Sequence, residues 1–262
     1  TVESLPLITS SILSKKIASG LSSLVLDVKV GNGSFNSTID IARDLSNSLV
    51  RVAKGAGLHC EAILTDMNQV LGKSAGHTLE ILECIKYIKN DFKDHRLEKI
   101  TNELISSLLV NIYKISKEEA YNKINTVINN GLAAEKFEMM VAALGGPKNI
   151  LSSFEKDLIN TSVRKDVFSS EEGWIEKIHT RELGLILIEL GGGRKQVTDK
   201  IDYGVGYDNV LNIGDEVNSS TALLSLYSSK NIDDNLIDKI KGCFIISDKK
   251  TQKLSEIFET IN

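Results

Sequence analysis

The sequence has few of the residues that build disulfide-rich or membrane-bound proteins. Its three cysteines, Cys60, Cys84 and Cys243, lie far apart and form no C-x-x-C pair. Neither a disulfide framework nor a zinc site is therefore expected, and the thiols suit a reduced, cytoplasmic protein. No apolar run is long enough to cross a bilayer and no signal peptide is recognisable, so we expect no membrane partner.

A basic cluster is also missing. Lys and Arg number 31 against 35 Asp and Glu, which gives a formal net charge of −4 and an isoelectric point of about 5.7. An acidic chain of this kind argues against nucleic acid as a partner, although local pockets for a small anion remain open. The 262 residues suffice for one large α/β domain, or for two smaller ones, with a buried core.

The spacing of apolar residues predicts alternating helices and strands in the first part of the chain. The order strand, helix, strand implies a parallel pair with a right-handed crossover, so we expect an α/β fold with a partly parallel sheet and flanking helices. The expected elements are a helix at 6–19, a strand at 23–30, a helix at 39–53, a strand at 60–65, a helix at 79–88 and three helical segments within 96–145.

The composition changes near residue 160, where we place a domain boundary. Short strands and helices mix after this point, which indicates a C-terminal α+β domain. The expected elements are short strands within 163–180, a helix at 181–190, strands near 203–207 and 222–227, a helix at 233–241, a strand at 243–247 and a terminal helix.

Four residues near the start of the chain recur at helical spacing and form a candidate binding stripe. Ile8, Ser11, Ile12 and Lys15 are spaced i, i+3, i+4 and i+7, so a helix places them on one face. The isoleucines would suit a flat heteroaromatic ring, and the hydroxyl and ammonium groups would suit its carbonyl oxygens. The same spacing also describes a half-buried helix whose lysine reaches into solvent.

Two polar loops follow the predicted strands, at the end of the sheet where parallel folds bind ligands. Glycines in Gly31–Gly33 let the backbone approach a ligand closely, but a lone G-x-G is equally a tight turn. The loop at 64–83 offers carbonyls and the carboxylates of Glu80 and Glu83, which could hold a hard cation or could simply be solvated. His77 has no second histidine or cysteine nearby, so zinc is not expected.

Together these segments resemble the thymidine/pyrimidine-nucleoside phosphorylase family. The resemblance covers nearly the whole chain in order, through TVESLPLITSSILSKK, LVLDVKVGNGSF, LTDMNQVLGKSAGHTLE, MMVAALGGP, GWIEKIHTRELG, ELGGGR, DKIDYGVG and GDEV. Val70 and His77 depart from it, since family members commonly carry proline and asparagine at these loop positions.

The resemblance implies a pentosyltransferase of pyrimidine salvage, which converts thymidine and inorganic phosphate into thymine and 2-deoxyribose 1-phosphate. Ser11 and Lys15 match the serine and lysine that contact the pyrimidine, and we expect them to be the catalytic residues in this chain. Ile8, Ile12 and Phe35 match apolar residues that line the base pocket.

A potassium site is implied as well, with the carbonyls of Leu71 and Ser74 and the side chain of Glu83 as ligands. No organic cofactor is implied, and phosphate is the co-substrate. The glycine-rich turn Gly191–Arg194 belongs to the family's C-terminal domain, where we expect a structural role.

The implied fold is that of nucleoside phosphorylases and phosphoribosyltransferases. Residues 1–160 would hold the remainder of a helical domain (about 1–20) and a central α/β glycosyltransferase-type domain. Residues 161–262 would form a C-terminal α+β domain of the pyrimidine-nucleoside-phosphorylase type. The full-length protein would be a cytoplasmic homodimer.

Part of the family's active site precedes the point that matches Thr1. Its phosphate-binding segments, a pocket histidine and a base-contacting arginine have no counterpart here, so we expect the natural N-terminus to lie upstream and this chain alone to be inactive. An alternative is a truncated, non-catalytic protein that binds a pyrimidine or a partner. A phosphoribosyltransferase is disfavoured by the GGGR and DxIDxxVG motifs. Whether thymidine alone or uridine as well is accepted stays open.

Overall fold

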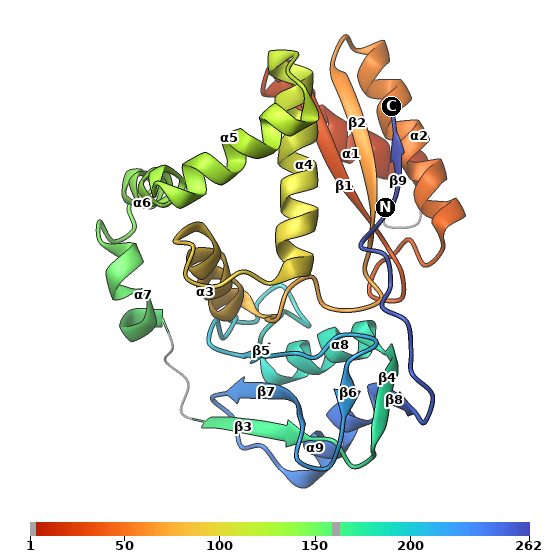
Figure 1. Ribbon diagram of the computed structural model, residues 1–262, viewed down its shortest axis with the longest axis vertical. Coiled ribbons are helices and arrows are strands. Elements are labelled where there is room, and N and C mark those ends of the chain that lie inside the picture. The colour runs from red at the N-terminus through yellow and green to blue at the C-terminus, as the bar shows by residue number, and fades with distance from the viewer. Residues whose placement is uncertain (1–3, 159–162) are drawn as a thin grey trace. The chain divides into compact units, whose positions relative to one another are not determined.

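The computed structural model describes residues 4–158 and 163–262 (Figure 1). The fold is a mixed α/β arrangement of helices and small sheets that forms two compact units. Unit 1 contains Thr1–Asn68, Glu98–Thr126 and Ser255–Asn262, and unit 2 contains Gln69–Leu97 and Val127–Leu254. The predicted domain boundary near residue 160 lies outside the described residues and stays a prediction.

Unit 1 is built on a sheet with the strand order β1-β2-β9. Strands β1 (Ser23–Val30) and β2 (His59–Asp66) pair in parallel along their whole length, which confirms the predicted parallel pair. Helix α2 (Ile39–Gly55) connects them and packs on the sheet (Figure 1). Thr38 caps this helix, because its hydroxyl accepts a hydrogen bond from the Ile41 amide.

The two faces of the β1–β2 pair differ in character, because side chains alternate along a strand. Toward α2, apolar residues such as Val28 and Leu64 form the unit 1 core. On the opposite face, the buried carboxylate of Glu61 accepts hydrogen bonds from Ser107 Oγ at 2.5 Å and Asn111 Nδ2 at 3.0 Å. Both donors belong to α4 (His95–Tyr113), so the polar contact fixes α4 to this side of the sheet.

Helix α1 (Leu5–Ala18) forms the outer layer of unit 1 and packs against α2. Its buried residues are Thr9 and Leu13, one turn apart. Thr9 Oγ1 lies 2.9 Å from Ser48 Oγ of α2, and Leu13 joins the core with 1% of its surface exposed. Pro6 stands in the first turn, where its missing amide hydrogen costs nothing, and Gly20 ends the helix with a φ of +69°.

The predicted helix at the end of the chain is wrong. These residues form β9 (Ile257–Ile261), which pairs antiparallel with β2. Ile261 and Phe258 pack into the unit 1 core, and the backbone of β9 satisfies the second edge of β2. Pairing with a distant strand therefore overrides the local helical preference of this short segment.

In unit 2, α3 (His77–Ile88), α6 (Leu132–Ala143) and α7 (Ile150–Leu158) share a small apolar cluster. Its buried members are Leu82, Ile85, Ile150 and Phe154. Helix α4 and helix α5 (Lys117–Asn129) each contribute residues to both units. The three helical segments predicted within 96–145 are confirmed as α4, α5 and α6.

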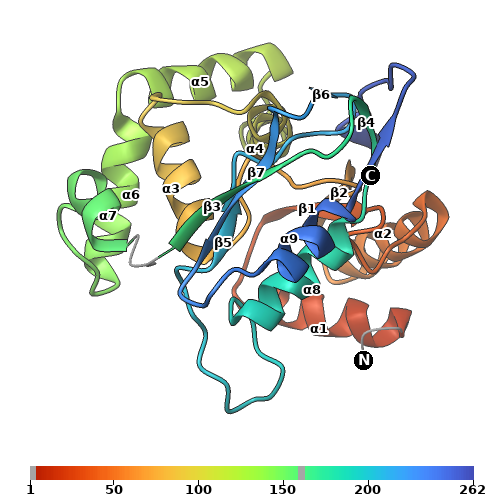
Figure 2. The ribbon, with the colours of Figure 1, turned by 90° about the horizontal axis from the view of Figure 1, so that it is seen from below.

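The rest of unit 2 combines two small antiparallel sheets with two helices. Figure 2 shows β3 (Val163–Phe168), β7 (Ala222–Ser228) and β5 (Gly206–Asp208) side by side, and they form one sheet. Strands β6 (Glu216–Val217), β4 (Gly173–Ile178) and β8 (Phe244–Ser247) form the other. The helices are α8 (Thr180–Leu190) and α9 (Asp234–Lys241).

The strand predicted near 203–207 is shorter than expected and begins only at Gly206. The preceding residues turn instead, with the Gly204 amide donating to Asp202 Oδ1 at 3.0 Å. Strand β5 also bridges the loop before α3, because Tyr207 and Ala75 exchange backbone hydrogen bonds of 2.7 and 3.0 Å. Among the described residues, none of the helices has the length and apolar character that a membrane crossing requires.

The contact between α1 and α2 can be tested by truncating one side chain. We expect Leu13→Ala to lower the free energy of unfolding by about 2–5 kcal/mol, because it leaves a cavity in the unit 1 core. The matched control is Leu7→Ala on the same helix, where the side chain is 52% exposed and the loss should stay below about 1 kcal/mol. Urea unfolding, with hydrogen exchange of α1 and α2 amides, measures both; equal losses would contradict this packing.

Candidate functional site

The structure places the predicted binding stripe on one face of α1, as its spacing implies. Ile8 and Ile12 are half-buried, whereas Ser11 and Lys15 are exposed. The stripe lies beside the seam of Thr9 and Leu13 that packs against α2, and Ile12 also touches the unit 1 core. The predicted grouping of these four residues is therefore confirmed, and their role as a binding site stays a prediction.

Neither polar group of the stripe is used to hold the fold together. Within residues 4–158 and 163–262, Ser11 Oγ and Lys15 Nζ take part in no hydrogen bond or ion pair. The backbone around them is occupied, since Ser19 Oγ donates to the Lys15 carbonyl at 2.8 Å and closes the helix end. A donor hydroxyl and an ammonium thus face outward from a helix fixed by its neighbouring side, which leaves both available to a ligand.

Phe35 lies on the loop after β1, separately from the stripe. Its side chain is 73% exposed, which is unusual for a large aromatic residue and leaves its ring open to contact. The loop itself is held by side-chain hydrogen bonds to the backbone, because Ser34 Oγ and Asn36 Nδ2 both donate to the Lys29 carbonyl, at 2.8 and 3.1 Å. Phe35 is therefore an exposed ring on a tethered loop.

A polar group on the sheet was not among the predicted site residues. Lys29 Nζ lies 2.6 Å from Asp27 Oδ2 and donates to Thr65 Oγ1 at 3.0 Å, and Thr65 donates to Asp27 Oδ1 at 2.5 Å. These residues sit opposite α2 on the β1–β2 pair. The sequence could have predicted that Asp27 and Lys29 share a face. Side chains alternate along a strand, and these two residues flank the core residue Val28. Within this group the Lys29 ammonium and the Asp27 carboxylate balance each other's charge, and Thr65 connects them from β1 to β2.

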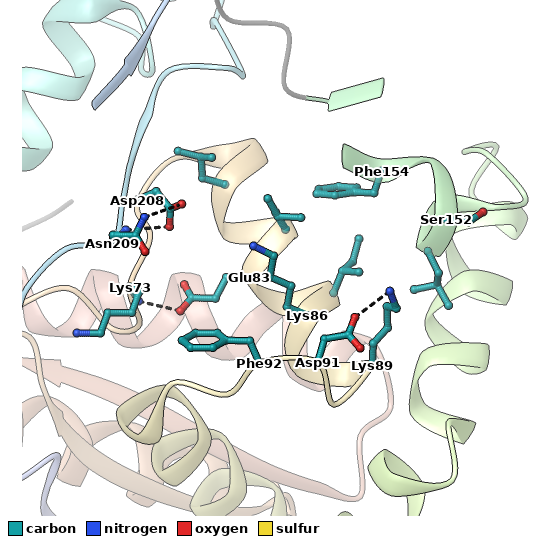
Figure 3. A pocket seen from close by; sticks show the side chains of 14 residues that line it. Lys73, Glu83, Lys86, Lys89, Asp91, Phe92, Ser152, Phe154, Asp208 and Asn209 are labelled. Atoms are coloured by element: carbon teal, nitrogen blue, oxygen red, sulfur yellow. Dashed lines mark hydrogen bonds and ion pairs between the residues drawn. The ribbon is translucent and has the colours of Figure 1, made fainter. Parts of the chain in front are cut away.

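The predicted cation ligands lie in unit 2, where Glu83 of α3 holds the preceding loop. Its carboxylate accepts hydrogen bonds from the Lys73 amide at 2.8 Å, the Ser74 amide at 3.1 Å and the Ser74 hydroxyl. Gly72 passes so close that an added Cβ would lie 2.5 Å from Glu83 Oε1. Figure 3 shows the Glu83 carboxylate turned toward Lys73. Residues 72–74 of the loop therefore all lie against the Glu83 carboxylate.

The donor types at this loop fit a hard monovalent cation. The carbonyls of Leu71 and Ser74 accept no hydrogen bond from the described part of the chain, so the lone pairs of both oxygens are not used by protein donors there. Glu83 Oε1 accepts a single amide, which leaves it a further lone pair. Across the described residues there is no cluster of three or more histidine, cysteine or acidic side chains, the pattern expected for a transition metal.

A cavity of about 750 Å³ opens beside this loop in unit 2. Glu83 is part of its lining, together with apolar side chains such as Leu82 and Phe154. Lys89 and Asp91 also line it and form an ion pair of 2.9 Å (Figure 3). The stripe residues belong to unit 1 and do not line it.

The two departures from the family pattern have local partners within unit 2. His77 Nε2 lies 3.0 Å from the Gly192 carbonyl, and its ring meets Tyr203 edge-on at 5.3 Å. Val70 packs against the unit 2 core. Two glycines of the glycine-rich turn have structural roles. The Gly192 carbonyl contacts His77 of helix α3, and Gly191 ends α8 with a φ of +107°.

The cysteines do not provide a nucleophile at neutral pH. Burial raises the pKa of the Cys60 thiol to about 11, and that of Cys243 to about 11 as well. The pKa of Cys84 is also raised, first by burial and then by the negative charges of Glu83 and Glu80. The thiolate is the reactive form, so all three groups are weak nucleophiles at pH 7.

Comparison with known proteins shows which families this chain is similar to. The model of the glycosyl transferase family a/b domain matches residues 1–134, and that of the pyrimidine nucleoside phosphorylase C-terminal domain matches residues 174–247. The chain is also 46% identical over 229 residues to a thymidine phosphorylase of Colwellia psychrerythraea. That alignment covers 87% of this chain and 52% of the relative, so the chain spans about half the relative's length.

The role of Glu83 in ordering its loop leads to a stability prediction. We expect Glu83→Ala to lower the free energy of unfolding by about 2–4 kcal/mol, because it leaves two amides and a hydroxyl without their charged acceptor. Glu176→Ala is the control, since Glu176 is exposed in the same unit and its loss should cost about 0.5 kcal/mol or less. Urea unfolding gives both values, and similar losses for the two variants would refute the role of Glu83.

Proposed function

The chain belongs to the thymidine/pyrimidine-nucleoside phosphorylase family, and from this membership we propose that the protein catalyses the phosphorolysis of pyrimidine nucleosides. The proposed reaction transfers the pentosyl group of thymidine from thymine to inorganic phosphate. The observation that carries the proposal is the open pair of Ser11 and Lys15 on α1, flanked by Ile8 and Ile12.

The proposed role of α1 is to bind the pyrimidine and to stabilise it as a leaving group. A phosphate oxygen attacks the anomeric carbon of the sugar while the glycosidic carbon–nitrogen bond breaks. The bonding electrons leave with the pyrimidine, where the negative charge spreads over the ring nitrogen and the carbonyl oxygens. The ammonium of Lys15 and the hydroxyl of Ser11 can donate to those oxygens more strongly as this charge grows, which lowers the barrier.

Apolar side chains would complete the base site. Ile8 and Ile12 border the two polar groups on the same helix face, and Phe35 offers an exposed ring on the loop after β1. A pyrimidine has flat apolar faces and a polar edge, so it needs both kinds of contact. Among the described residues we therefore assign side chains only to the pyrimidine side of the reaction.

The structure of unit 2 also supports a potassium site at the loop before α3. The proposed ligands are the open carbonyls of Leu71 and Ser74 and the carboxylate of Glu83, all of them hard oxygen donors. A bound cation would balance the charge of Glu83 and order this loop.

We place the protein in the cytoplasm as a homodimer, as the family resemblance implies. Three free cysteines with no disulfide among them support a reducing compartment.

The leaving-group role of Lys15 predicts a loss of turnover without loss of the fold. In the natural protein, Lys15→Ala should lower kcat for thymidine by about 10²–10³-fold, as expected when a donor to a developing negative charge is removed. Lys16→Ala is the matched control, because this neighbouring lysine is also exposed but lies off the stripe. Steady-state kinetics with a thermal melt distinguish the two, and near-normal turnover of a folded Lys15→Ala protein would exclude the assignment.

The potassium proposal predicts a cation-dependent melting temperature. A cation that binds only the folded state stabilises it by mass action, by about 1.4 kcal/mol at ten times its Kd. We therefore expect a higher Tm in potassium than in tetramethylammonium at equal ionic strength, and a smaller difference for Glu83→Gln. Identical melting of the wild-type protein in both salts would show that no such site operates.

A further inference from the structure

The two loops that follow β1 and β2 are joined to each other by a network of hydrogen bonds within unit 1. Strand pairing continues past the strand ends, where the Met67 amide donates to the Val30 carbonyl at 2.6 Å and the Gly33 amide to the Met67 carbonyl at 2.9 Å. The loop carrying Phe35 is therefore bonded to Met67, the first residue after β2.

Asn68 supplies the side chain at the centre of this contact. Its Oδ1 accepts a hydrogen bond from the Asn32 backbone amide at 3.0 Å and a longer one from Asn32 Nδ2 at 3.3 Å. Its own backbone carbonyl accepts from Asn32 Nδ2 at 3.4 Å. One side chain thus satisfies a backbone donor in the middle of the glycine loop, where no strand partner remains.

Asn68 is itself held in place by a buried carboxylate. Asp66, the last residue of β2, is 1% exposed. Its Oδ1 accepts from the Asn68 amide at 3.0 Å and from Asn68 Nδ2 at 2.7 Å. The carboxylate therefore fixes both the backbone and the amide group of Asn68, and this orients Oδ1 toward the glycine loop.

Gly31 shows how closely the two loops approach. A Cβ at this position would lie 2.7 Å from three atoms of Asn68, including its Oδ1, and the φ of Gly31 is +132°. A side chain here would push Asn68 away from Asn32. The glycine is thus required by the contact itself as well as by its backbone conformation.

We propose that Asn68 is a positioning residue for the pyrimidine site: by clamping the loop at Asn32, it holds Phe35 where the base binds. Phe35 has 73% of its surface exposed, so its own side chain has little packing to fix it, and the loop backbone must do so. The inference rests on the proposed function, since it assumes that Phe35 contacts the base. The ordering cost of a free loop would otherwise reduce substrate affinity.

The test compares two ways of opening the clamp in the natural protein. Asn68→Ala removes the acceptor of the Asn32 amide, and Gly31→Ala displaces Asn68 sterically. For both, we expect amide exchange of residues 32–36 to rise about tenfold, as for one lost hydrogen bond. The KM for thymidine should rise about fivefold to tenfold with kcat and the KM for phosphate within about twofold, since uniform base binding is lost.

Two matched controls isolate the clamp. Asn32→Ala removes the same kind of side chain but leaves the bond from its backbone amide to Asn68, so its effects should stay within about threefold. Asn122→Ala alters an exposed asparagine of α5 and should change neither exchange in the loop nor KM. Equal behaviour of Asn68→Ala and Asn122→Ala would overturn the proposal, as would faster loop exchange with an unchanged KM for thymidine.

Thymine binding to the wild-type protein, followed by NMR, separates this inference from the function on which it rests. Binding and turnover in the wild type, without an effect of Asn68→Ala, would refute the clamp alone. A wild-type protein that neither binds thymine nor cleaves thymidine would refute the proposed function, and with it the role of Asn68 at a base site, whatever the exchange data show.

Discussion

The parallel pairing of β1 and β2 is the constraint on which unit 1 depends. Ser23 lies opposite His59 and Val30 opposite Asp66, so the two strands end at the same edge of the sheet. The loops that follow them must therefore emerge side by side, which is why Asn32 and Asn68 can meet. The same pairing presents a continuous apolar face to α2, and α2 in turn supports α1.

Only part of the surface of helix α1 is used to hold the fold together. Thr9 and Leu13 face α2 and fix the helix, whereas Ser11 Oγ and Lys15 Nζ on the adjacent face form no hydrogen bond or ion pair with the described part of the chain. If the Lys15 ammonium formed an ion pair within the protein, its positive charge would already be balanced by that partner. If Lys15 binds the base as proposed, its uncompensated charge on a helix fixed from its other side would provide a rigid electrostatic contact.

Local sequence patterns predicted most of the fold, since α1, β1 and α2 follow from apolar spacing and flanking glycines. The stripe was predictable for the same reason, because helical spacing alone sets which residues share a face. β9 was not predictable, since its conformation depends on the free edge of β2, far away in sequence. The clamp through Asn68 was also missed: an asparagine after a strand reads as a turn residue, and its partner is defined only by the register of two strands.

The position of β9 in the sheet has a consequence for biosynthesis. Unit 1 takes its third strand from Ile257–Ile261, after the chain has passed through the whole of the second part of unit 2, 127–254. A ribosome delivers the chain from its N-terminus, so β1 and β2 emerge long before the strand that covers the second edge of β2. During that interval the edge is an open template for pairing with other chains, and rapid synthesis of the last part would shorten the exposure.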